Sequence, residues 1–146
     1  MTINEDCIRD ILGYLVKNID YEKDIDGSFR VVQVSLFQLY KDADLSTLYK
    51  DKDIMYSVLK LLEIHFIKVS DIFPKNQSII DRCTICEVTY EGHKFYETIQ
   101  PESVWNKTKS IVGKIGNHTL GFIESVAHDV AVESAKELVK ISSWNV

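Results

Sequence analysis

The sequence has few cysteines and no long hydrophobic segment. Its three cysteines are an odd number in a chain of 146 residues, and thiols stay reduced inside the cell, so we expect no disulfide framework. No apolar run approaches the ~20 residues needed to cross a bilayer, and the acidic first six residues lack the basic region of an export signal. These absences predict a cytoplasmic protein with no membrane partner.

Positive charge is also scarce. The chain carries 17 Lys and Arg residues against 22 Asp and Glu residues, which gives a formal net charge of -5. A field of this sign repels the phosphates of DNA, although a local basic strip can dominate at short range once salt screens the other charges. Nucleic-acid binding would therefore depend on a local cluster of basic side chains.

The sequence lacks a recognisable catalytic combination. His93 follows Gly92 and could act as a general base, but no nucleophile elbow and no carboxylate dyad in a glycine-rich setting accompanies it. We interpret Gly92 as a residue that lets a helix lie close to a neighbouring hairpin, and His93 as a residue that hydrogen-bonds locally. We therefore predict that the chain is not an enzyme, has no catalytic residues and needs no cofactor.

What is present is the composition of a globular domain with one core, with 45% hydrophobic and 27% charged residues. Thr2 and Glu5 have the spacing of a capping box, and the apolar residues that follow predict a helix to about Asn18. An acidic turn at 20–27 then precedes a β-branched stretch at 29–34, which predicts a short strand.

Helical periodicity returns after this strand. Short helical pieces are expected at 36–40 and 45–49, and a second long helix from Asp51 to Glu63. Its inward positions are apolar. The spacing predicts that its outward positions are Lys52, Asp53, Tyr56, Ser57, Lys60 and Glu63.

The second half of the chain begins with a predicted hairpin. Residues 64–69 and 79–88 are rich in β-branched side chains and flank a turn-rich loop at 70–78. Thr89 is placed to cap a helix that ends at Pro101, because proline cannot continue the helical hydrogen bonds. An amphipathic segment and a last helix follow; Asn117 or Thr119 is expected to cap the last helix, which reaches about Ile141.

This order of elements predicts an α+β fold, mostly α. It consists of a winged helix-turn-helix core with a two- or three-stranded small antiparallel sheet and a C-terminal helical extension. We expect residues 1–100 to form the winged-helix domain. Residues 101–146 would form the extension, packed on that domain or on a second copy.

Two linked motifs resemble an uncharacterised bacterial and phage family of unknown function. They are Gly-His-x-Phe at 92–95 and Val-Trp-Asn-Lys-x-Lys at 104–109, and the resemblance extends over about residues 50–125. It implies a winged-helix-like fold and no established activity or ligand. The family's corner after the long helix resembles Ala-Gly-Leu-Ile, whereas this chain has Ile64–Ile67, so the corner is expected to bend differently. The motif residues with implied structural roles are Thr89, Gly92, His93, Phe95 and Trp105.

Double-stranded DNA is the first partner that a winged helix suggests, and a transcription-regulatory role would follow. The exposed face of the helix from Asp51 to Glu63 would enter the major groove, and the tip of the hairpin would touch the backbone or the minor groove. The candidate DNA-binding residues are Lys52, Tyr56, Ser57, Lys60, Lys75 and Asn76.

A protein-interaction or dimerisation module without DNA binding is the alternative. Asp51, Asp53 and Glu63 lie on or beside the same helix face and cancel its positive charges. In addition, the last helix has a wide apolar stripe, which suggests packing against a second copy through residues 117–141. The stripe contains Leu120, Ile123, Ala127, Val130, Leu138 and Ile141.

The pair Cys83 and Cys86 could supply half of a zinc site, with His93 or His65 as further ligands. Such sites need a second matched pair, and residues three apart on a strand point to opposite faces. We interpret both as ordinary thiols and predict no metal site. Trp105 is interpreted as a core residue rather than a platform for nucleic-acid bases.

Overall fold

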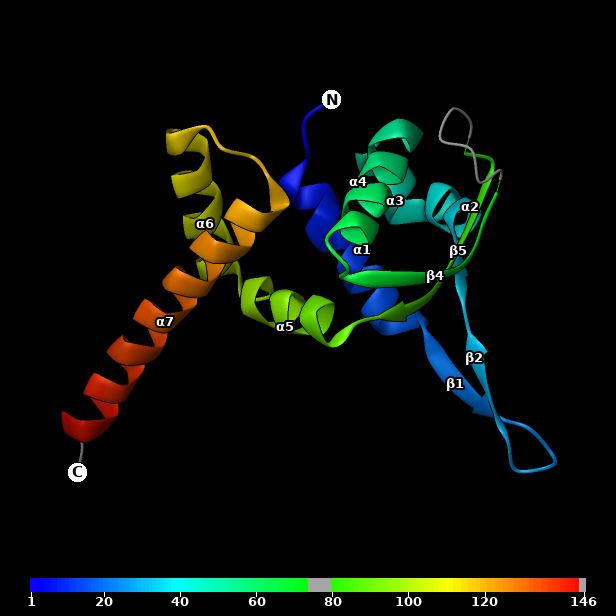
Figure 1. Cartoon of the computed structure of the whole chain (residues 1–146). Helices are drawn as coiled ribbons and strands as arrows, with labels where there is room; N and C mark the ends of the chain where they lie inside the picture. Colours follow the sequence, from blue (N-terminus) through cyan, green and yellow to red (C-terminus); the bar gives the residue numbers. More distant parts are fainter. Residues whose placement is uncertain (74–79, 145–146) are drawn as a thin grey trace.

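The computed structural model describes residues 1–73 and 80–144, which form an α+β fold that is mostly helical (Figure 1). Two small antiparallel sheets accompany the helices. Within the described ranges, no helix combines the length and hydrophobicity needed to cross a membrane. In chain order the elements are α1 Glu5–Asn18, β1 Asp20–Lys23, β2 Phe29–Val32, β3 Val34–Ser35, α2 Leu36–Lys41, α3 Ala43–Leu48, α4 Asp51–Glu63, β4 Ile67–Phe73, β5 Arg82–Val88, α5 Tyr90–Ile99, α6 Glu102–Ile115 and α7 Leu120–Trp144.

Helix α1 is capped by Asn4 rather than by Thr2. The Asn4 side chain accepts a hydrogen bond from the N–H of Cys7 at 3.1 Å. The predicted capping box of Thr2 and Glu5 is therefore wrong, because a second good capping residue lies closer to the helix. The helix ends at Asn18, as predicted.

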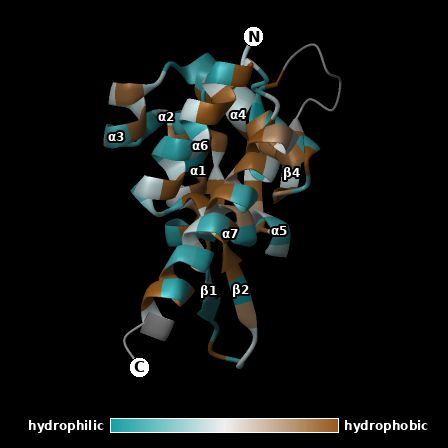
Figure 2. Cartoon of the chain, turned by 90° about the vertical axis from the view of Figure 1, so that its left-hand side faces the viewer, coloured by the Kyte–Doolittle hydropathy of each residue, from teal (hydrophilic) through white to brown (hydrophobic). Residues whose placement is uncertain are grey.

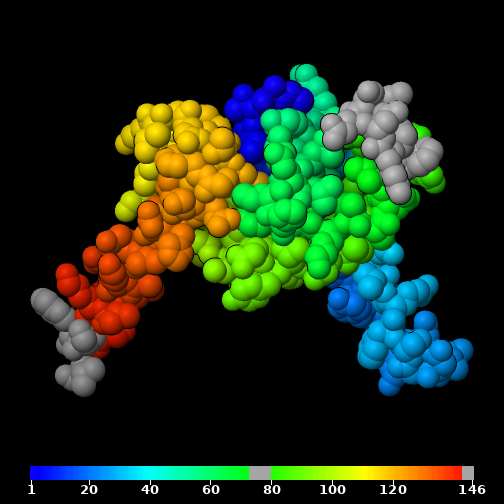
Figure 3. Space-filling model, viewed as in Figure 1, coloured from blue at the N-terminus to red at the C-terminus, as the bar shows by residue number. Residues whose placement is uncertain are grey.

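A β-hairpin follows α1: its second strand, β2, lies within the strand predicted at 29–34, whereas β1 lies where the sequence predicts an acidic turn. Strand β1 pairs with β2 in antiparallel register, from Asp20 opposite Val32 to Lys23 opposite Phe29. All four residues of β1 are exposed, so the strand lacks the alternation of buried and exposed positions that identifies a strand in a sequence. The hairpin projects from the body of the molecule (Figure 3).

The second sheet has the strand order β3-β5-β4. The single strand predicted at 29–34 is divided, because Val34 and Ser35 leave the hairpin and pair with β5. Strand β4 continues to Phe73, so the loop predicted at 70–78 begins too early. Residues 74–79 of that loop lie outside the described ranges.

His65 forms the corner between α4 and β4 in the left-handed conformation, with a φ of 64°. The N–H of Phe66 donates to the carbonyl of Leu61 at 2.9 Å, and that of His65 donates to Leu62 at 3.1 Å. This pair of bonds is the Schellman motif that often closes a helix at a glycine. The corner therefore has the conformation that is usual at a glycine, although histidine occupies the position.

Replacement of His65 by glycine should raise the free energy of unfolding by about 1 kcal/mol, because glycine adopts positive φ without the steric cost of a Cβ atom. Denaturation in guanidinium chloride measures this change. The matched control is His93→Gly in α5, where an exposed histidine with helical φ is replaced and a loss of about 0.5 kcal/mol is expected. A loss at both positions would contradict the argument from strain.

Helices α5, α6 and the first half of α7 share one core with α1. A single cluster of buried side chains extends from Cys7 in α1 to Val130 in α7. Helix α6 ends at Gly116, whose φ of 80° reverses the chain toward α7. Beyond Val130 helix α7 leaves the body as a second projection (Figure 3), and hydrophobic residues recur along it (Figure 2).

Candidate functional site

The exposed side of α4 is formed by Lys52, Tyr56, Lys60 and Glu63, which we call the α4 face. Lys52 is exposed, whereas Tyr56 and Lys60 are half-buried. The Tyr56 hydroxyl donates to the carbonyl of Met1 at 3.2 Å. The N-terminal residues thus contact the α4 face and cover part of it.

Ser57 does not belong to this face. It is 1% exposed, and its hydroxyl donates to the carbonyl of Asp53 at 2.8 Å. The prediction that Ser57 points outward is therefore wrong, because a small side chain at the edge of the apolar stripe is turned into the core. Lys75 and Asn76, the predicted contacts of the hairpin tip, lie outside the described residues.

Charges on the α4 face neutralise each other. The ammonium group of Lys60 lies 2.8 Å from the Glu63 carboxylate and 5.3 Å from the centre of the Tyr56 ring. The hydrogen bond to Glu63 raises the pKa of Lys60. Of the two lysines predicted to bind DNA through this helix, Lys52 is exposed and Lys60 is half-buried, and Lys52 lies between Asp51 and Asp53.

A cavity of about 650 Å³ lies beside the second half of α4. The residues that line it come from three separate parts of the chain: the N-terminal residues, α4 with its C-cap, and the connection from α6 to α7 with the first two residues of α7. Figure 1 shows where these parts lie in the fold. The residues that line it are Met1, Thr2, Ile3, Tyr56, Lys60, Glu63, Ile64, Gly116, His118, Thr119, Leu120 and Gly121.

The connection from α6 to α7 is held against the start of α1. His118 Nδ1 lies 2.5 Å from the Glu5 carboxylate, and the side chain of Asn117 accepts hydrogen bonds from the N–H and hydroxyl of Thr119. These contacts fix the third wall of the cavity relative to α1. They also leave Nε2 as the ring nitrogen of His118 that does not contact Glu5.

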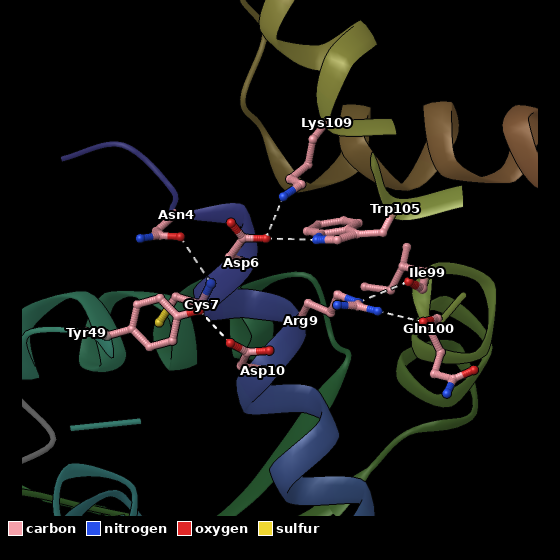
Figure 4. Close-up of polar contacts among 10 residues, drawn as sticks. All are labelled: Asn4, Asp6, Cys7, Arg9, Asp10, Tyr49, Ile99, Gln100, Trp105 and Lys109. Atoms are coloured by element: carbon pink, nitrogen blue, oxygen red, sulfur yellow. Dashed lines mark hydrogen bonds and ion pairs between the residues drawn. The ribbon is translucent and has the colours of Figure 1, made fainter. Parts of the chain in front are cut away.

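Trp105 and Asp6 join α6 to α1 (Figure 4). Trp105 is 2% exposed, in agreement with its interpretation as a core residue, and its indole N–H donates to the Asp6 carboxylate at 2.9 Å. Lys109 lies 2.9 Å from the same oxygen. Burial raises the pKa of Asp6, but the hydrogen bonds from Lys109 and Trp105 outweigh this effect and lower it.

Arg9 ties α1 to the end of α5. Its guanidinium group donates to the carbonyls of Ile99 and Gln100, at 3.1 and 2.6 Å (Figure 4). It also lies 5.8 Å from the centre of the Trp105 ring. The contacts of Arg9 and Trp105 therefore hold α1, α5 and α6 together, and the cavity wall that follows α6 is attached to this group of helices.

The motif residues of α5 have structural positions. Thr89 caps the helix by accepting a bond from the N–H of Gly92 at 3.1 Å, and Phe95 stacks on Phe66 with ring centres 5.1 Å apart. A Cβ atom at Gly92 would lie 2.1 Å from the carbonyl oxygen of Phe66, so this glycine permits the close approach that the sequence predicts. His93 is exposed, and its main-chain N–H donates to Thr89 at 2.8 Å.

The three cysteines have ordinary surroundings. Cys7 and Cys83 are buried, and burial raises the pKa of each thiol to about 11. Cys86 is half-buried and its thiol donates to the carbonyl of Lys68 at 3.5 Å. Among the described residues, no group of three or more His, Cys, Asp or Glu side chains is placed to hold a metal ion.

One protein family, described as "Hypothetical protein (DUF2513)", matches residues 2–118. The chain belongs to this family. The DUF2513 match covers α1 to α6 and ends two residues before α7. Neither curated proteins nor solved structures gave a match to the chain.

The sequence did not predict that the residues lining the cavity lie together. Within the DUF2513 match, Ile3, Lys60 and His118 are far apart along the chain, and periodicity reports only which side of a single helix is buried. Tyr56 and Lys60 were identified because of their place on α4. His118 had no local signal at all.

Proposed function

We propose that the chain is a winged-helix scaffold that acts as a protein-interaction module and forms a homodimer through the end of α7. The winged-helix assignment is supported by the order of elements. Helix α1 comes first, α2, α3 and α4 lie between β3 and β4, and β5 pairs with both strands in the order β3-β5-β4. This connectivity corresponds to a three-helix core covered by a hairpin.

The observation that carries the dimer is the apolar surface of α7 beyond the body. Val132, Leu138, Val139 and Ile141 are 39%, 66%, 68% and 58% exposed. At 3.6 residues per turn, Leu138 and Ile141 continue the line of side chains that packs Ile123 and Val130 into the core. The apolar stripe predicted from the sequence therefore continues along α7 beyond the part that packs on the body of the molecule.

The charged side chains of this segment, which carry both signs, gather on one side of the helix. Glu133, Lys136, Glu137 and Lys140 lie within about 100° of arc, and the four exposed apolar residues are spread over about 180° of the remaining circumference. In a two-fold symmetric dimer the same apolar surface of both copies meets, so each copy covers the exposed apolar side chains of the other. Because Lys60 is paired with Glu63 on the α4 face, this face favours a protein-interaction function over binding to the phosphates of DNA.

Substitution of Leu138 and Ile141 by glutamate should convert a dimer into a monomer and weaken association by at least about 100-fold, because four charges would enter an apolar contact. Sedimentation velocity over a range of concentrations measures the effect. Removal of all of α7 is unsuitable as a test because Leu120, Ile123 and Val130 belong to the core.

The matched control is the pair Glu133→Gln and Glu137→Gln on the charged side of the same helix. These variants should remain dimeric. A monomeric wild-type chain at about 100 μM would refute the dimer, since specific interfaces of this kind bind well below that concentration.

Nucleic-acid binding is the second candidate function, favoured by the exposure of Lys52 in the first turn of α4. Such a protein would bind random duplex DNA at low salt, with an affinity that falls as salt increases. The Lys52→Gln variant should bind about threefold to tenfold more weakly at every sequence. A fluorescence-anisotropy titration decides the question, because a chain without salt-sensitive affinity does not have this function.

A further inference from the structure

The cavity beside α4 has the size and composition of a site for a small organic molecule. Its volume of about 650 Å³ falls inside the ~300–1,000 Å³ that such sites occupy. Ile3, Ile64 and Leu120 supply apolar walls, and Tyr56 adds an aromatic ring. A few polar groups converge on the same space, as expected of a site that orients its ligand.

The charges around the cavity are placed at different depths. The side chain of Lys60 is 32% exposed, whereas that of its partner Glu63 is 70% exposed. The cation is therefore the more enclosed member of the pair, and the carboxylate lies nearer to solvent. His118, which also lines the cavity, is 36% exposed, and its partner Glu5, which does not line it, is the more buried of the two at 20%.

The start of α7 lies beside the same space. Leu120 and Gly121, the first two residues of this helix, line the cavity. The N-terminus of a helix carries a partial positive charge and main-chain N–H groups without helical partners, which favour an anion. Lys60, His118 and the first turn of α7 thus surround one space from two sides.

We propose that this cavity binds a small organic anion with an aromatic or branched apolar body. The acidic group of the ligand would lie between Lys60 and the start of α7, and would replace Glu63 as the partner of Lys60. The apolar body would lie against Ile3, Ile64 and Leu120. This site is separate from the exposed half of α7, so it does not depend on the dimer.

Two fluorescent probes that share one aromatic body test the proposal. Anilinonaphthalene sulfonate (ANS) carries a sulfonate, and N-phenylnaphthylamine is the same body without the charge. The full-length chain should bind ANS at one saturable site, about tenfold more tightly than the uncharged probe, because charge-assisted hydrogen bonds favour the anion.

Four variants locate the site. Lys60→Gln should weaken ANS about tenfold and Glu63→Gln should tighten it, with little change for the uncharged probe. Gly121→Leu should abolish binding of both probes, because a side chain there would occupy the cavity. A Cβ atom at Gly121 meets nothing within 4 Å, so this variant should fold. Gly113→Leu on α6, which is equally open and does not line the cavity, should bind both probes as the wild type does.

Three results would overturn the proposal. The first is the absence of saturable ANS binding, and the second is equal affinity for the two probes. The third is ANS binding that is unchanged in both Lys60→Gln and Gly121→Leu, because probe bound to the exposed residues of α7 would behave in that way. None of these results bears on the dimer, which sedimentation tests separately.

Discussion

Substitution of Gly92 by alanine should lower the free energy of unfolding by about 3 kcal/mol. The added Cβ would lie 2.1 Å from the carbonyl oxygen and 3.0 Å from the carbonyl carbon of Phe66. This carbonyl cannot move away freely, because it accepts a hydrogen bond from the N–H of Thr89 at 3.0 Å. Helix α5 would have to shift away from the corner at His65. Urea denaturation followed by circular dichroism measures the loss.

Gly113→Ala is the matched control for this prediction. Gly113 lies in α6, and a Cβ at this position meets nothing within 4 Å. Alanine is the better helix former, so the control should gain about 0.5–1 kcal/mol. A Gly92→Ala chain as stable as the wild type would show that α5 and the corner are not packed as described.

Replacement of Trp105 by alanine should cost about 3–5 kcal/mol, since it removes the largest fully buried side chain of the core. The loss has two parts, a cavity between α1 and α6 and the missing hydrogen bond to Asp6. The same denaturation experiment measures their sum. We expect the variant to remain folded only at low temperature or in the presence of a stabilising osmolyte.

Trp105→Phe separates the two parts. Phenylalanine keeps an aromatic ring in the core but donates no hydrogen bond to Asp6, whose carboxylate retains Lys109. A smaller loss of about 1–2 kcal/mol is expected. In the Asp6→Ala background, which removes the acceptor, the additional loss from Trp105→Phe should shrink, and an unchanged loss would argue against the hydrogen bond.

Local signals account for the parts of the fold that were predicted. The end of α1 at Asn18, the cap at Thr89 and the end of α5 before Pro101 follow from side chains within one helical turn of the boundary. The periodicity of α4 likewise fixed its bounds, Asp51 and Glu63. Such features depend on neighbours in the sequence and need no knowledge of the fold.

Strand β1, and with it the β1–β2 hairpin, was missed for a physical reason. Its pairing is held by main-chain hydrogen bonds and by the exposed ion pair between Arg30 and Glu22, at 2.6 Å. A strand that buries neither face has no hydrophobic period, and its acidic residues resemble a loop. Ser57 was predicted to be exposed because it is polar. It is buried, since its hydroxyl donates a hydrogen bond to the carbonyl of Asp53 within the same helix.

The candidate site lay furthest beyond sequence reasoning. Residues 1–3, 56–64 and 116–121 meet at the cavity through contacts between distant parts of the chain, among them those of Trp105 and Arg9 with α1, α5 and α6 and that of His118 with Glu5. The sequence indicates that Trp105 is a core residue. It does not indicate which helix the indole contacts, and therefore does not place His118 beside α4.

The anchored first half of α7 has a consequence for any association made by its second half. The helix has 25 residues and a length of about 37 Å at 1.5 Å per residue. Because the residues up to Val130 are fixed in the core, the exposed half is helical and has a defined orientation relative to the body in the unbound chain. Binding by a preorganised segment loses little conformational entropy, so even a modest apolar contact can support a specific complex.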